Sequence, residues 1–171
     1  NDAPSLTLSL TEQAHTATGA VVVDPALTIS DVDSLDFATG ILTVELSSGG
    51  VADDRLTVRD EGTATGQVSV VGATVRFNFG AGSVDIGTIS GGNGTGDPLL
   101  VSFNSAATEA AVQAVARNVS FDTIAAVPSE ADRVIKFTIT DGDGGASTSD
   151  SLTLRVSPTQ ALWVSAQDDN L

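Results

Sequence analysis

Several residue types are missing from this 171-residue sequence or scarce in it. There is no cysteine, methionine or tyrosine, and there is one histidine and one tryptophan. The absence of cysteine excludes disulfides, thiolate zinc sites and cysteine nucleophiles. With His15 as the sole histidine, we expect neither a histidine-based metal site nor a charge-relay triad. Paired carboxylates could form a glycosidase dyad, but few aromatic rings could stack on a sugar. We therefore expect no enzyme activity.

Basic residues are also few. The sequence has 7 Lys and Arg against 22 Asp and Glu, a formal net charge of -15 at pH 7. Such a chain repels nucleic acid and anionic membranes, so we expect neither as a partner. It attracts cations, and bound Ca²⁺ would relieve the repulsion among its own carboxylates. Because 41% of its residues are hydrophobic, the chain is not a disordered acidic tail.

Long apolar runs are absent as well. No stretch approaches the roughly 20 apolar residues of a membrane span, so we expect no integral membrane protein. The opening Asn1-Asp2 does not resemble a signal peptide. We expect this chain to be a segment of something longer.

Short stretches of alternating apolar and polar residues dominate the sequence. In the stretch 134–140, Ile135, Phe137 and Ile139 alternate with polar residues, as in a half-buried strand. We expect strands of this kind around residues 6–10, 20–23, 27–29, 41–46, 56–58, 68–71, 74–79, 84–89, 99–103, 134–140 and 152–156. The last two should pair as a hairpin. Many short strands separated by turn residues predict an all-β sandwich.

One stretch has helical spacing instead. Val112, Val115 and Val119 recur at intervals of three and four residues. Ser105 or Thr108 can cap the start of this helix, and Asn118 can end it. We predict one short helix that plugs an end of the sandwich.

Two strands end in the pattern Asp-x-Asp. Asp141 and Asp143 follow the strand 134–140, and Asp31 and Asp33 follow the strand around Ile29. Two nearby carboxylates favour a shared cation, and Ca²⁺ accepts several carboxylate and carbonyl oxygens in flexible geometry. The alternative is a pair of solvated turns, since Asp and Gly are common in turns. Neither pair fits the EF-hand loop, so we expect a site built between loops.

These motifs and their order resemble the cadherin-like tandem repeats of large bacterial surface and secreted adhesins. The resemblance covers about residues 1–157 and includes a linker with Asn1, Asp2 and Pro4. It implies a cadherin-like or immunoglobulin-like antiparallel β-sandwich that binds Ca²⁺ at its joint with a neighbour. The calcium ligands we expect are Asn1, Asp2, Glu12, Asp31, Asp33, Asp141 and Asp143.

The sequence also departs from that family. The region 60–121 is extra, and the Asp-Arg-Glu motif of cadherins is only echoed by Asp54-Arg55-Leu56. We expect residues 1–157 to form the module. Residues 158–171, with Trp163, would be a tail, a linker or the first strand of a following module.

The function implied by this resemblance is that of a calcium-stiffened structural repeat in an extracellular adhesin on the bacterial surface. Its partners would be neighbouring repeats of the same protein, and further self-assembly or surface ligands are open to it. Two alternatives remain: a self-assembling surface-layer or filament subunit, and a carbohydrate-binding accessory module.

Overall fold

The computed structural model describes residues 2–16, 19–144, 147 and 149–157. Strands make up 46% of the protein and helix 6%, which confirms the predicted all-β sandwich with one short helix. The tail 158–171, with Trp163, lies outside the described residues, as does Asn1. The elements are β1 (Ser5–Thr7), β2 (Glu12–Thr16), β3 (Val21–Val22), β4 (Thr28–Ser30), β5 (Ile41–Ser48), β6 (Asp54–Val58), β7 (Val68–Val71), β8 (Thr74–Asn78), β9 (Ser83–Ser90), β10 (Leu99–Phe103), α1 (Glu109–Arg117), β11 (Val119–Thr123), β12 (Arg133–Ile139) and β13 (Asp150–Ser157).

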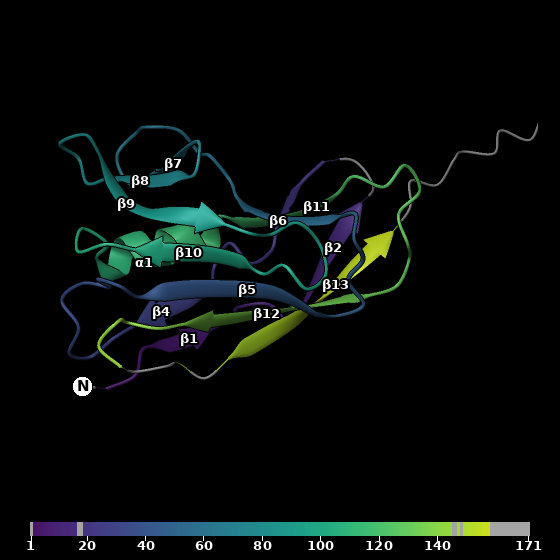
Figure 1. Cartoon of the computed structure of the whole chain (residues 1–171), viewed down its shortest axis with the longest axis horizontal. Coiled ribbons are helices and arrows are strands. Elements are labelled where there is room, and N and C mark those ends of the chain that lie inside the picture. The colour runs from purple at the N-terminus through teal and green to yellow at the C-terminus, as the bar shows by residue number, and fades with distance from the viewer. Residues whose placement is uncertain (1, 17–18, 145–146, 148, 158–171) are drawn as a thin grey trace, which may run out of the picture.

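One layer of the sandwich is a large sheet with the strand order β2-β13-β12-β5-β10-β9-β8-β7 (Figure 1). The predicted final hairpin is present, with Phe137 of β12 opposite Asp150 of β13. All pairings in this sheet are antiparallel except one, because β2 runs parallel to β13. The expected antiparallel arrangement of this sheet therefore holds with this one exception.

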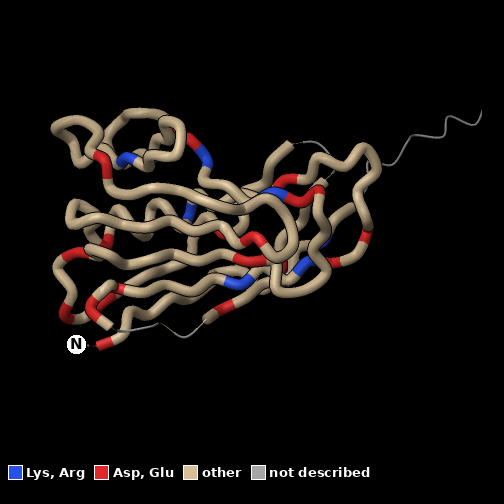
Figure 2. The backbone as a smooth tube through the Cα atoms, in the orientation of Figure 1, with Lys and Arg blue, Asp and Glu red and all other residues tan. Residues whose placement is uncertain are grey.

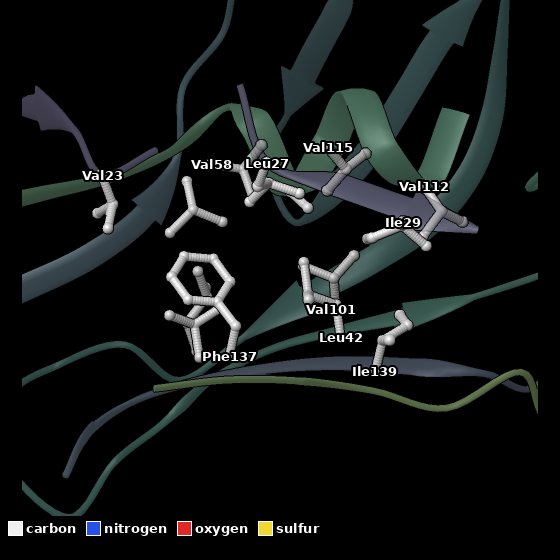
Figure 3. Close-up of a cluster of buried hydrophobic side chains, with 14 of the residues drawn as sticks. Val23, Leu27, Ile29, Leu42, Val58, Val101, Val112, Val115, Phe137 and Ile139 are labelled. Carbon is white, nitrogen blue, oxygen red and sulfur yellow. The ribbon is translucent and has the colours of Figure 1, made fainter. Parts of the chain in front are cut away.

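The second layer is assembled from smaller pieces. It contains the pair β1-β4, the sheet β3-β11-β6 and helix α1. Apolar residues from both layers meet in one core, which Figure 3 shows with Phe137 and Leu42 on the large sheet facing Leu27 and Val115 on the other side. These side chains are fully buried. At roughly 25 cal/mol per Å² of apolar surface, this burial is the main force that holds the layers together.

Helix α1 has the predicted ends. The Oγ1 of Thr108 accepts a hydrogen bond from the Ala111 N–H, and Asn118 is the C-terminal cap. The buried residues of the helix lie on one face, as in an amphipathic helix, and Val112 and Val115 are part of the core. We expected the helix to plug an end of the sandwich, and this expectation was wrong. It lies in the second layer beside β4.

The contact between α1 and β4 is a ladder of side chain to backbone hydrogen bonds. The Arg117 Nε donates to the Leu27 carbonyl at 2.7 Å, and the Gln113 Oε1 accepts from the Ile29 N–H at 3.0 Å. Glu109 Oε2 accepts from the Asp31 N–H at 2.9 Å. Four helical residues rise about 6 Å, and two strand residues about 6.6 Å, so the two spacings match. The helix thus satisfies the edge of β4 that β1 leaves open.

Asp54 was expected to echo a cadherin ligand motif, but its carboxylate lies inside the protein. It forms an ion pair with Arg133, whose Nε and Nη2 donate to its two oxygens at 3.0 and 3.1 Å. Both side chains are 0% exposed. This pair ties the start of β6 to the start of β12, and it satisfies Asp54 without any external cation.

Candidate cation site at one end of the sandwich

The loop that follows β4 contains two of the predicted calcium ligands, Asp31 and Asp33. The Asp31 Oδ1 accepts hydrogen bonds from the N–H groups of Asp33 and Ser34, at 3.1 and 3.0 Å. Partial burial opposes ionisation of Asp31, but these backbone hydrogen bonds outweigh it and lower the pKa of the carboxyl below its ordinary value of 3.8. Asp31 is therefore held in its charged form by the turn that it caps.

The N-terminal segment reaches the same loop. The N–H of Asp2 donates to both carboxylate oxygens of Asp33, at 3.2 and 3.1 Å. The linker and Asp33, both expected at the calcium site, are thus in contact through the backbone N–H of Asp2.

A third carboxylate comes from the helix. Glu109, in the first turn of α1, contacts the N–H of Asp31. It was not among the expected site residues, because it is 78 positions from Asp31 in the sequence and only the packing of α1 on β4 joins them. The remaining oxygen of Asp31, Oδ2, is buried, and no hydrogen-bond donor in the described part of the chain reaches it. An acceptor of this kind is chemically suited to a hard cation.

The second Asp-x-Asp pair lies at the same end of the molecule. Asp141 is buried, and its Oδ1 accepts from the Asp143 N–H at 3.0 Å. Gly142 has a φ of 94°, and a Cβ built on it would lie 2.0 Å from the Ala38 carbonyl oxygen. Only glycine therefore allows this turn to pack against the segment that follows Asp31 and Asp33. Figure 2 shows this end, where the chain begins, with several red acidic segments and no blue basic segment in its lower part.

Glu12 does not join this group. Its Oε1 lies 2.6 Å from the Nε of Arg155, which lowers the pKa of Glu12 through a hydrogen bond to its carboxylate. In the register of the sheet Glu12 is opposite Thr153, and Thr153 is opposite Val134. Asp141 follows Val134 by seven residues, which is about 23 Å in an extended chain at about 3.3 Å per residue. The expectation of a shared site between Glu12 and the strand-end aspartates is not met by this arrangement.

Two apolar side chains project from the same loop. Val32 is 87% exposed and Leu35 is 94% exposed, so both stand in water next to the aspartates. An exposed Leu alone is ordinary, but two on one loop leave apolar area uncovered. This loop therefore combines negative charge with apolar surface.

The carboxylates of Asp31, Asp33 and Glu109 are linked through backbone N–H groups of the loop and the N-terminal segment. In the described ranges, no group of three or more Asp, Glu, His or Cys side chains converges as a metal site.

The same residues include no helix that is both long and apolar enough to cross a bilayer. Comparison of the chain with protein-family models, curated proteins and solved structures finds no match.

Proposed function

We propose that this chain is a calcium-binding structural repeat of an extracellular bacterial adhesin or surface protein. The observation that carries the proposal is the loop 31–34. Its Asp33 carboxylate binds the backbone of the N-terminal segment, and its Asp31 keeps a buried carboxylate oxygen without a donor. A cation bound here would join the linker to the body of the domain.

The available oxygens suit Ca²⁺. The loop offers carboxylates from Asp31 and Asp33, with Glu109 beside them, and Ca²⁺ takes six to eight oxygens in flexible geometry. Since the described carboxylates do not form a complete cage, the remaining ligands would be main-chain oxygens, water or groups from a preceding repeat. Bound Ca²⁺ would supply the positive charge that this acidic end lacks.

The path of the chain fits a repeat in a row. The N-terminal segment lies at the acidic end, whereas β13 runs to the opposite end of the long axis (Figure 1). Neighbours attached to the two ends would extend the molecule lengthwise. The exposed Val32 and Leu35 would then be covered by the preceding neighbour, which removes their apolar surface from water.

The test compares thermal unfolding in Ca²⁺ and in chelator. A ligand that binds only the folded state, at about 100 times its Kd, adds about 2.7 kcal/mol of stability. We expect Ca²⁺ to raise the Tm of the natural chain and the double variant Asp31→Asn, Asp33→Asn to lose most of that rise.

The matched control is Asp60→Asn with Asp97→Asn. Each of these aspartates accepts a backbone hydrogen bond in a turn, as Asp31 does, and the charge change is the same. The control should keep the calcium response. Identical Tm values of the natural chain in Ca²⁺ and in chelator, or an equal loss in both double variants, would overturn the proposal.

A further inference from the structure

A pocket of about 420 Å³ lies between helix α1 and the hairpin β7-β8. Its walls come from the extra region 60–121 together with neighbouring segments. The lining residues fall into two groups. Phe77, Pro25, Ala110 and Ala114 give it apolar surface. Arg59, Arg117, Glu61, Gln113 and Asn118 give it polar groups. Its volume is within the range of sites for small organic molecules, and its lining is more polar than in most of them, which favours a polar ligand.

Two arginines line this pocket, although the whole chain has only 7 basic residues and a net charge of -15. The guanidinium of Arg59 is fixed by the Asn118 side chain, whose Oδ1 accepts from its Nε at 3.0 Å and from its Nη2 at 2.9 Å. The amide nitrogen of Asn118 donates to the Ala114 carbonyl at 3.0 Å, so the orienting group is itself fixed. Glu61 completes the set by accepting from Arg59 Nη2 at 3.1 Å.

Arg117 differs from most basic residues of the protein. Its Nε donates to the Leu27 carbonyl, but no carboxylate in the described residues lies within 4.0 Å of its guanidinium. Arg133, Arg155, Arg76, Arg59 and Lys136 all have a carboxylate partner. The hydrogen bond through Nε holds the guanidinium of this pocket-lining residue, and its Nη groups remain as further donors.

We infer that this pocket binds a small carboxylate ligand of the acidic-sugar class. The two Nη groups of Arg117 match the two oxygens of a carboxylate, the geometry in which arginine binds most strongly. Glu61 accepts hydrogen bonds and Gln113 has an amide nitrogen that can donate, which suits the hydroxyls of a sugar ring. Ala110 and Ala114, with the accessible edge of the largely buried Phe77, supply the apolar part of the lining for the ring carbons.

This inference is independent of the calcium site. The pocket is lined along α1 from Ala110 to Arg117, but Glu109 is not among its lining residues and contacts the loop 31–34 instead. A variant of Arg117 should therefore leave the calcium-dependent rise in Tm unchanged, and the double aspartate variant should leave ligand binding unchanged.

The test titrates the full chain with sodium glucuronate, glucose and sodium acetate, and follows amide chemical shifts by NMR. We expect glucuronate to shift the amides of residues around Gln113 and Asn118 in a saturable way. Glucose should cause no saturable shift, because it lacks the carboxylate. Acetate should bind more weakly than glucuronate. Absence of saturable shifts with glucuronate, or equal binding of glucose, overturns the inference.

Variants assign the binding to this pocket. Arg117→Gln should weaken glucuronate binding at least about tenfold, as expected for loss of a charge-assisted pair. The matched control is Arg55→Gln. Arg55 also donates to backbone carbonyls and has no carboxylate partner in the described residues, but it does not line the pocket. An equal loss in both variants shows a general charge effect and overturns the assignment.

A second variant covers the case in which Arg117→Gln does not fold. Ala110 is exposed on α1 and lines the pocket, so Ala110→Leu fills it while both arginines remain. Leucine keeps the helical propensity of this position. Glucuronate binding should fall in this variant. Unchanged affinity in folded Ala110→Leu places the ligand elsewhere.

Discussion

The two ends of the sandwich treat their carboxylates in different ways. At the end where β6 and β12 begin, Asp54 is matched by the guanidinium of Arg133, in a pair that excludes water. At the other end, Asp31 is held by backbone N–H groups, and its pKa is lowered without any basic side chain. The first arrangement completes its charge balance inside the protein. The second keeps a half-buried carboxylate without a basic partner in the described residues, so a bound cation could stabilise the fold there.

The largest change in the free energy of unfolding should come from breaking the buried ion pair between Asp54 and Arg133. In Arg133→Met, the buried carboxyl group of Asp54 loses its cationic partner and the two hydrogen bonds from the guanidinium. Removal of one partner of a buried ion pair costs about 3–5 kcal/mol. We expect a loss of that size in chemical denaturation, with or without Ca²⁺.

A double variant sharpens this result. Asp54→Leu with Arg133→Met removes both charges, so it should be more stable than the sum of the two single changes predicts. Strict additivity of the three free energies would show that the ion pair does not couple the two strands.

A smaller effect is expected at the acidic end on acidification. Because folding lowers the pKa of Asp31, its contribution to stability is complete above the ordinary value of 3.8 and is lost as the pH falls through the lower folded value. The natural chain should exceed Asp31→Asn in stability by a few tenths to about 1 kcal/mol at about pH 6 in chelator. This difference should shrink below pH 3.8. Denaturation of both proteins across this range checks it, and a difference that grows on acidification contradicts it.

The smallest effect should come from Glu12→Gln. About half of each side chain in its pair with Arg155 is exposed to water, so the lowered pKa of Glu12 reflects a contact that solvent screens. We expect a change within the error of chemical denaturation, and no change in the calcium response. A loss of calcium response in this variant would restore Glu12 to the cation site.

Alternation of apolar residues was enough to predict most strands, and it failed where a strand buries little. β2 (Glu12–Thr16) buries only His15, so no apolar alternation marks it. β11 (Val119–Thr123) starts directly after the helix cap Asn118, so no turn residues separate the strand from the helix in the sequence. The sequence therefore did not predict this strand. The helix itself was predicted with its caps, because capping depends on residues close in the sequence.

The candidate site was predictable only in its local parts. Asp31 and Asp33 are two residues apart, so the sequence alone predicts that they lie in one loop. The turn at Asp141 is predicted by the glycines that follow it. Glu109 joins Asp31 only through the ladder of hydrogen bonds between α1 and β4, and Glu12 leaves the site because β2 pairs in parallel with β13. Both depend on pairings of segments far apart in the chain, which no local pattern encodes.

The parallel pairing of β2 and β13 has a mechanical consequence. β2 is entered from the end where the chain begins, and β13 leaves at the opposite end. A force that pulls these two ends apart would slide the strands along each other, so the bridged pairs from Thr153–Glu12 to Ser157–Thr16 would bear the load together. If the two strands were antiparallel, the same force would break their hydrogen bonds one after another from one end of the pair. The sheet is therefore joined in the direction that resists tension along the long axis of the molecule.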